Sequence, residues 1–309
     1  MPDNTWLNPY KLCSLKCLSS GPSQGIVYEL DDSSVIKVPF QYPVGGGSTI
    51  DEQHDHLELS LKSFRCFKQE CRIYEVLSKY SHPNIVARLQ SSKSDCIILE
   101  RVESLKESWK KSTKCFHQIW IFELVNVLSF LEEELGYLHG DITISNIGIG
   151  HDNRLKVFDF GSAVHKTDED FESQVLEDQF NVANCIYFLA TGKDVFAKAR
   201  SAADINRIRR DLQKGKYPYS ASAKMYQEVI EACWSQKRFS SFKHLKKALE
   251  ILQEQTASDL VLSMHEVNAV NTCPSPDLFL EGLMKEESWM DEEEYCVAWS
   301  KMGFEIPLV

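Results

Sequence analysis

The fold is decided by the stretch His139-Gly140-Asp141-Ile142-Thr143-Ile144-Ser145-Asn146 and by Asp159-Phe160-Gly161, which follows it. Asn146 comes five residues after Asp141, and Asp159 comes thirteen residues after Asn146. The Asp141 carboxylate can accept or orient the proton of an attacking hydroxyl group. Asn146 and Asp159 supply hard oxygen atoms, which Mg²⁺ prefers as ligands. Each motif alone is weak, but the ordered pair predicts a site for phosphoryl transfer.

The composition of the 309-residue chain limits the classes of partner. The chain carries 34 basic and 45 acidic residues, which gives a formal net charge of −11. This balance argues against a general binder of nucleic acid or of anionic membranes, because both need a basic surface. No apolar run approaches the roughly 18–20 residues of a membrane span. We therefore expect no nucleic-acid partner and no membrane partner.

The first ten residues lack the charged and then apolar pattern of a secretory signal. The ten cysteines include no Cys-x-x-Cys pair. Reduced thiols are the rule in proteins of the cytoplasm and nucleus. We therefore expect a cytoplasmic or nuclear protein with free cysteines.

The first third of the chain is rich in predicted strands. Residues 25–38 alternate β-branched residues around an Asp-Asp-Ser-Ser turn, which predicts a hairpin. Residues 41–62 contain Gly45-Gly46-Gly47 and a polar stretch, and we expect a flexible insert there. A helix is predicted at 63–80, where apolar residues recur at helical spacing. The strands expected next span 85–90 and 95–102.

The rest of the chain is mainly helical. Its predicted helices span 115–135, 176–191, 202–213, 222–234 and 242–254, and two short strands fall in 147–158. This order of elements predicts an α+β fold with a strand-rich lobe at 1–102 and a helical lobe at 103–254. Residues 255–309 form a tail, which we expect to dock on the domain through the apolar side chains of Trp289, Trp299, Phe304 and Leu308.

Residues 20–254 resemble the eukaryotic protein-kinase superfamily, and the whole chain resembles short, divergent kinase-like proteins of filamentous fungi. The resemblance rests on the two motifs above, on Val35-Ile36-Lys37, on His82-Pro83-Asn84-Ile85-Val86 and on the Asp178-Gln-Phe segment. It implies a bilobal kinase-like fold, with a small β-rich N-lobe and a larger helical C-lobe, that binds ATP and Mg²⁺ and acts on a protein substrate. Asp141 is then the catalytic residue, and the metal ligands are Asn146 and Asp159.

The resemblance also assigns residues to ATP. Lys37 would hold the α- and β-phosphates, and Glu70 would pair with Lys37; Glu75, just over one turn later, is the rival. Leu99 falls at the gatekeeper position. Further residues expected at the nucleotide are Gly25, Val27, Val35, Glu100, Val102 and Gly148. The family has a small residue at position 35 and a large one at position 148. The reversed sizes here indicate either independent drift or compensation across the adenine ring.

Four features depart from the family pattern. Pro22 replaces a glycine of the phosphate-binding loop and removes an amide donor. Gly140 replaces the arginine that receives an activation-loop phosphate, so we expect no switch of that kind. Thr143 and Ser145 stand where a cation usually lies near the γ-phosphate, and Lys166 is a candidate replacement. An Ala-Pro-Glu motif is missing between Asp159 and Asp178. In the family, the glutamate of that motif pairs with an arginine that corresponds to Arg238. Without the motif, Arg238 is left to pair with Glu169, Glu172 or Glu177.

Three functions remain open from the sequence. The first is an active Ser/Thr-type protein kinase that needs no activation-loop phosphorylation. The second is a pseudokinase that binds or scaffolds with little catalysis, which Pro22 and Thr143 favour. The third is a small-molecule kinase of the aminoglycoside- or choline-kinase type, which the missing Ala-Pro-Glu motif favours.

Overall fold

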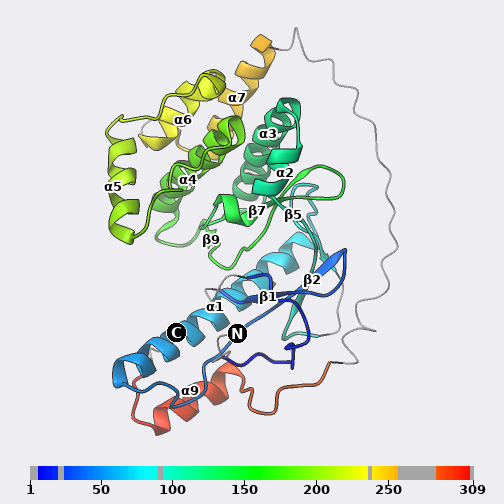
Figure 1. The fold of residues 1–309 in the computed structure, drawn as a ribbon, viewed down its shortest axis with the longest axis vertical. Coiled ribbons are helices and arrows are strands. Elements are labelled where there is room, and N and C mark those ends of the chain that lie inside the picture. Colours follow the sequence, from blue (N-terminus) through cyan, green and yellow to red (C-terminus); the bar gives the residue numbers. More distant parts are fainter. Residues whose placement is uncertain (1–5, 20–23, 90–92, 236–238, 257–282, 307–309) are drawn as a thin grey trace. The chain divides into compact units, whose positions relative to one another are not determined.

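The computed structural model describes residues 6–19, 24–89, 93–235, 239–256 and 283–306 (Figure 1). The chain forms two compact units. Unit 1 comprises residues 1–79, 87–101 and 271–309, and unit 2 comprises residues 80–86 and 102–270. Strands and helices occur in both units, so the predicted mixed α+β class is confirmed.

Unit 1 contains an antiparallel four-stranded sheet. Its strands, in spatial order, are β1 (Ile26–Glu29), β2 (Ser34–Val38), β4 (Ile97–Glu100) and β3 (Arg88–Leu89). The turn between β1 and β2 is closed by Asp31, whose side chain accepts a hydrogen bond of 2.7 Å from the Ser33 backbone N–H. Such a bond within an Asp-x-Ser segment is a typical turn device. The hairpin predicted at 25–38 is therefore confirmed.

Helix α1 (Ile50–Leu77) is longer than predicted. The flexible insert expected at 41–62 is wrong from Ile50 onward. Thr49 caps the helix by accepting a hydrogen bond of 3.1 Å from the Glu52 backbone N–H, and acidic residues in the first turn favour the helix dipole. The stretch looked unstructured because most of its side chains are polar. Leu57 and Leu61 are nevertheless buried, because a distant segment covers them.

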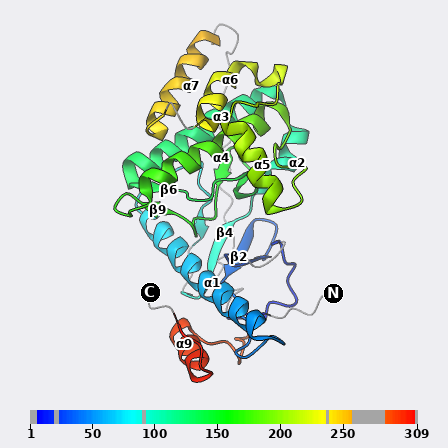
Figure 2. The same ribbon diagram turned by 90° about the vertical axis from the view of Figure 1, so that its left-hand side faces the viewer.

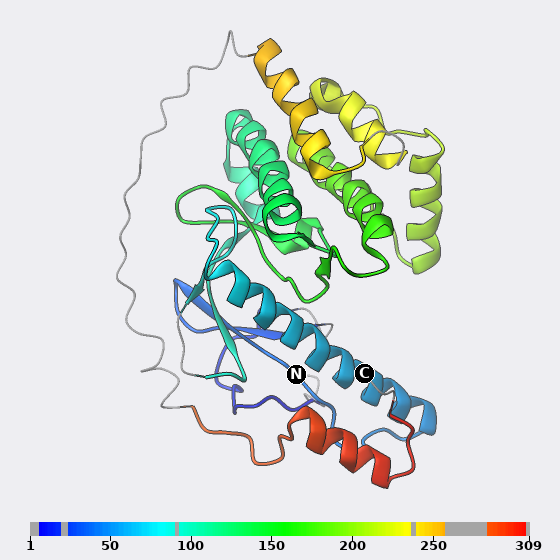
Figure 3. The same cartoon turned by 180° about the vertical axis from the view of Figure 1, so that it is seen from behind.

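That distant segment is α9 (Glu292–Lys301), which packs against α1 within unit 1 (Figure 3). Tyr295 and Trp299 are fully buried in one apolar cluster with Leu57, Leu61 and Phe64. The Tyr295 hydroxyl also donates a hydrogen bond of 2.9 Å to the backbone carbonyl of Tyr42. Docking of the tail is thus confirmed for residues 283–306, and Leu308 lies outside the described residues.

Unit 2 is built around packed helices, several of which are seen together in Figure 2. The helices are α2 (Leu105–Lys111), α3 (Lys114–Phe130), α4 (Phe171–Thr191), α5 (Ala202–Gln213), α6 (Gln227–Trp234) and α7 (Phe242–Thr256). Predicted helix boundaries in this part of the chain differ by a few residues at most, except that α3 continues as a π-helical turn, η1 (Leu131–Leu135), and that a 3-10 helix, η3 (Ala221–Tyr226), precedes α6.

Short strands in unit 2 flank the loop that carries Asp141 and Asn146. One sheet has the order β5 (Glu103–Ser104), β7 (Ile147–Ile149) and β8 (Leu155–Val157). A second pairs β6 (Tyr137–Leu138) with β9 (Val164–His165). The segment from His139 to Asn146 therefore begins directly after β6 and ends directly before β7. Both of its ends are fixed by backbone ladders.

The His82-Pro83-Asn84-Ile85-Val86 string belongs to unit 2, where it lies along β8. The Asn84 side chain donates a hydrogen bond of 2.8 Å to the Leu155 carbonyl. The Val86 N–H bonds the Val157 carbonyl at 3.0 Å, and the Val157 N–H bonds the Asn84 carbonyl at 2.9 Å. The string thus acts as a short extra partner of β8 and braces the hairpin that follows Asn146.

Two expectations about the environment of the chain can be compared with the structure. Within the described ranges, no helix combines the length and apolarity that crossing a bilayer requires. The nine cysteines in those ranges are all free thiols, and Cys273 lies outside them.

Candidate phosphoryl-transfer residues

Lys37 and Glu70 form a buried ion pair in unit 1. Lys37 projects from β2 and Glu70 from α1, and 2.5 Å separates Nζ of Lys37 from Oε2 of Glu70. The two side chains are only 5 % and 1 % exposed. Glu75, the rival partner, is exposed. Burying two charges costs several kcal/mol of desolvation per ion, so such pairs seldom serve stability alone.

The neighbours of Lys37 on the sheet are residues that the resemblance assigned to ATP. The β1–β2 register places Val27 opposite Lys37, and the β2–β4 register places Leu99 opposite Val35. Gly25 has φ +152°, and a Cβ added there would lie 3.3 Å from Cε of Lys37 and 3.0 Å from a backbone carbonyl. A glycine therefore lets the chain pass close over the Lys37 stem. Unit 1 brings all of these residues together.

For Glu100, the resemblance assigned the backbone carbonyl to adenine, and the side chain of Glu100 makes a separate contact. Its carboxylate accepts a hydrogen bond of 2.9 Å from the Ala87 backbone N–H, which ties β4 to the start of β3. Gly21 and Pro22, which belong to the predicted phosphate-binding loop, lie outside the described residues.

In unit 2, Asp141 and Asn146 lie at the two ends of a compact loop. The Asn146 amide group donates to the Asp141 backbone carbonyl at 2.8 Å and to Asp141 Oδ2 at 3.3 Å. The first bond closes the loop, and the second orients the Asp141 carboxylate. Because the amide nitrogen is used in this way, the amide oxygen of Asn146 is the atom that could bind a metal.

Asp159 stands in a strained backbone conformation, with φ +69°. Such left-handed residues are uncommon outside glycine and cluster at functional sites. The residues on either side hold it in place. The His139 ring bonds the Phe158 carbonyl at 3.0 Å and packs against the fully buried Phe160 ring at 5.2 Å. The segment around Asp159 is thus fastened to the segment that carries Asp141.

Gly140 is required by packing. It has φ +80°, and a Cβ added there would lie 1.8 Å from the carbonyl oxygen of Ser162. No side chain of any kind fits at that distance. The close approach of the loop after Asp159 therefore requires glycine at this position.

Asp178, on α4, holds the loop that carries Gly140 and Asp141 in place. It accepts a hydrogen bond of 3.0 Å from the Gly140 backbone N–H and another of 2.8 Å from the Gln174 side chain. Burial disfavours the charged form and raises the pKa of Asp178 to about 6, despite these hydrogen bonds. The sequence predicted the brace at Asp178 but missed Gln174. The spacing of four residues on one helix was the available signal.

The raised pKa of Asp178 predicts a pH-dependent stability. The unfolded chain releases this proton near the ordinary pKa of 3.8, whereas the folded chain keeps it until about pH 6. Between these values the unfolded state binds fewer protons, so the free energy of unfolding contributed by Asp178 decreases as pH rises, by roughly 3 kcal/mol. We expect the stability difference between the wild type and Asp178→Asn to shift by about 2 kcal/mol of that total between pH 4 and pH 6. Urea unfolding at several pH values measures it, and a pH-independent difference would contradict the assignment.

Two charged residues that were expected to replace missing family residues, Lys166 and Glu177, contact other parts of unit 2. The stem of Lys166 packs over Gly136, with its carbon atoms 2.9–3.3 Å from where a Cβ of Gly136 would lie. Gly136 precedes β6, so Lys166 lies at the end of the β6–β9 ladder opposite to the Asp141 loop. Glu177 forms an ion pair with Arg209 of α5. Arg238, its suggested partner, lies outside the described residues.

Gly148 also has a packing reason to be small. It pairs with Ser104 of β5, and a Cβ added to it would lie 2.4 Å from a methyl group of Val102 and 2.9 Å from the Glu103 carbonyl. Replacement of Gly148 by leucine would therefore disturb unit 2 directly. The suggested compensation with Val35 cannot be isolated by that substitution.

The metal-binding potential of the described residues is confined to few groups. No cluster of three or more His, Cys, Asp and Glu side chains occurs in those ranges. Mg²⁺ bound beside phosphates needs only one or two protein ligands, because phosphate oxygens and water complete its shell. The amide oxygen of Asn146 and the carboxylate of Asp159 fit this requirement.

In a comparison with known protein families, no family model matches the chain.

Proposed function

We propose that this protein transfers the γ-phosphoryl group of ATP, with Mg²⁺, to a hydroxyl group of a protein substrate. The buried Lys37–Glu70 ion pair carries the proposal. An apolar pair of the same size would pack as well at lower desolvation cost, so a retained charge at Lys37 suggests an anionic ligand. Lys37 would neutralise phosphate oxygens, and Glu70 would hold the lysine side chain in place.

The loop of unit 2 supplies the other groups that this chemistry needs. Asp141, oriented by Asn146, would accept the proton of the attacking hydroxyl group. Asn146 and Asp159 would hold Mg²⁺, which neutralises charge on the phosphates. Gly25, Val27, Val35, Leu99, Glu100, Val102 and Gly148 remain the residues proposed for the rest of the nucleotide. A protein that only scaffolds has no use for Lys37, Asp141, Asn146 and Asp159 together.

A pseudokinase is the second candidate, and one observation favours it. Thr143 and Ser145 supply no cation to the Asp141 loop, and Lys166, the expected substitute, packs against Gly136. Loss of one preorganised charge can lower the rate by on the order of 10²–10³. The proposed kinase is therefore a slow one.

One experiment separates the candidates. The purified protein is incubated with Mg²⁺ and γ-labelled ATP, and the label is followed into the protein itself, into generic protein substrates and into amino-alcohols. Label in serine or threonine of protein substrates supports the proposal. Label in amino-alcohols alone would assign a small-molecule kinase. ATP binding without transfer would assign a pseudokinase.

The close packing at Gly140 leads to a prediction about regulation. With no arginine to receive a phosphate, the active arrangement should not require phosphorylation of residues 162–177. We expect phosphatase-treated protein to keep its full activity. Activity is measured before and after treatment, with mass spectrometry to confirm removal. A large decrease that maps to a phosphosite in 162–177 would contradict the prediction.

A further inference from the structure

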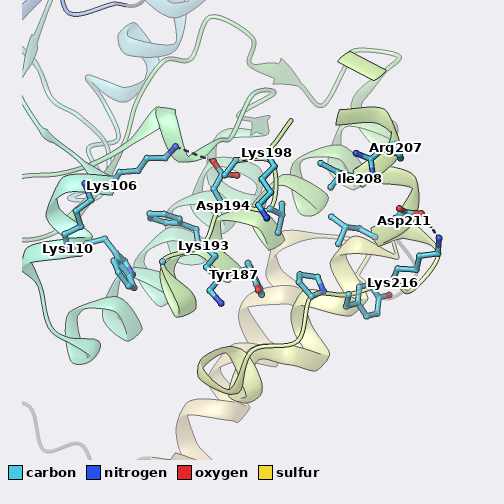
Figure 4. A pocket seen from close by; sticks show the side chains of 18 of the residues that line it. Lys106, Lys110, Tyr187, Lys193, Asp194, Lys198, Arg207, Ile208, Asp211 and Lys216 are labelled. Carbon is cyan, nitrogen blue, oxygen red and sulfur yellow. Dashed lines mark hydrogen bonds and ion pairs between the residues drawn. The ribbon is translucent and has the colours of Figure 1, made fainter. Parts of the chain in front are cut away.

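Unit 2 contains a large groove that the proposed phosphoryl transfer does not use (Figure 4). Its volume is about 1090 Å³. The groove lies between α2, the end of α4, the loop that follows α4, and α5. Its floor is apolar and largely aromatic, and consists of Trp109, Tyr187, Phe188, Ile208, Leu212, Tyr217 and Pro218.

The aromatic floor is fixed by contacts on its far side. The Trp109 indole N–H donates a hydrogen bond of 2.8 Å to the Leu189 carbonyl, and its ring stacks on His117 at 4.6 Å. The same ring presses on Gly192, where an added Cβ would come within 2.3 Å of it. Tyr217 stacks on Trp234 at 5.6 Å. A floor held in this way is preformed, so little entropy is lost when a ligand covers it.

The rim of the groove is basic. Three carboxylates line it, and each is paired with a cation, namely Lys106 with Asp194, Lys110 with Glu107, and Lys216 with Asp211. In each pair the lysine is the more exposed partner. Lys193, Lys198 and Arg207 add three further exposed cations, of which Arg207 is paired with Asp204, a residue outside the lining. The residues that line the groove therefore carry an excess of three positive charges, or two once Asp204 is counted, in a chain whose net charge is −11.

We infer that this groove binds an acidic peptide segment of a protein substrate, which inserts a large apolar side chain into the floor. Charge complementarity selects the Asp and Glu side chains of the segment, and the aromatic floor selects its anchor. The inference rests on the proposed function. Helix α2, which forms one wall of the groove, also contacts the 3-10 helix η2 (Ile144–Asn146) at the end of the Asp141 loop. A segment bound here would bring its flanking residues towards Asp141.

A nucleic acid is a less suitable occupant. Its evenly spaced phosphates need basic residues without interspersed carboxylates, whereas Glu107, Asp194 and Asp211 line this rim. The negative charge of the whole chain also opposes a long polyanion more than a short peptide.

The test uses the full-length protein without ATP. The probe is a short fluorescent peptide of Asp and Glu residues with one central leucine, and binding is followed by fluorescence anisotropy. We expect Lys193→Glu combined with Lys198→Glu to weaken binding by about tenfold. We expect Ile208→Asp, or replacement of the peptide leucine by serine, to weaken it by at least about tenfold. The matched control is Lys247→Glu, a charge reversal on exposed α7 outside the groove, which should leave the affinity unchanged.

The outcomes separate this inference from the proposed function. Three results would each overturn the groove assignment. They are equal binding of the acidic peptide and a lysine-rich version, an affinity that the groove variants do not change, and tighter binding of an RNA oligonucleotide at the same site. Binding that depends on the groove but is accompanied by no phosphoryl transfer would support the groove and overturn the kinase proposal. With transfer established, substrates that carry the acidic segment should show a lower KM, and the double lysine variant should abolish that difference.

Discussion

Asp141→Asn should lower phosphoryl transfer by about 10²–10⁴-fold, the usual contribution of a positioned general base. ATP binding should survive, because Asp141 serves the hydroxyl nucleophile and not the phosphates. The fold of the loop should also survive. The 2.8 Å hydrogen bond from Asn146 is accepted by the Asp141 backbone carbonyl, which the substitution does not change.

Asp159→Asn gives the contrasting result in the same assay. Asparagine tolerates the left-handed backbone at position 159, so the loop should keep its conformation. Loss of the carboxylate should instead weaken Mg²⁺-dependent ATP binding, measured by calorimetry. Asp170→Asn, on an exposed residue outside the site, is the matched control and should change neither quantity. Equal loss of ATP binding in the Asp141 and Asp159 variants would contradict these roles.

Trp299→Ala should destabilise unit 1 by about 3–5 kcal/mol, as expected when a buried tryptophan is truncated. The Trp299 ring is fully buried against the N-terminal half of α1, in the cluster that includes Leu57 and Leu61. Urea unfolding followed by circular dichroism measures the effect.

The matched control lies on the same helix. Val297 is 48 % exposed on α9, and Val297→Ala should change the free energy of unfolding by no more than about 0.5 kcal/mol. Equal effects of the two substitutions would mean that α9 does not pack on α1 in solution. Because α1 also carries Glu70, the Trp299 variant should lose ATP affinity as well if the α1 position matters for Lys37.

The sequence predicted those parts of the structure that depend on local pattern. The β1–β2 hairpin follows from alternation, and the helix at 202–213 follows from helical spacing. The choice of Glu70 over Glu75 came instead from the resemblance, through the distance from Glu70 to His82. The first half of α1 was missed because its apolar face is narrow and its partner, α9, lies more than 200 residues away in the chain. No local pattern carries that information.

The sequence also could not predict where a backbone segment comes so close to another residue that only glycine fits. Gly140 was interpreted as the loss of an arginine, whereas the structure gives a contact with the Ser162 carbonyl that excludes any side chain. Gly148 was interpreted through a nucleotide, whereas Val102 and Glu103 already require it to be small. In both cases the reason lies in a backbone segment that the residue touches only after folding.

The packing of α9 on α1 has a consequence during protein synthesis. Tyr295 leaves the ribosome 235 residues after Ser60, to whose side chain its hydroxyl donates a hydrogen bond. At elongation rates of about 5–20 residues per second, the apolar face of α1 stays uncovered for on the order of ten to fifty seconds. Leu57, Leu61 and Phe64 are then exposed on every nascent chain, and they remain exposed on any chain released before Tyr295 and Trp299 are added. Such chains should be held by chaperones and degraded, so a premature stop codon shortly before the codon for Tyr295 should remove the protein and not merely shorten it.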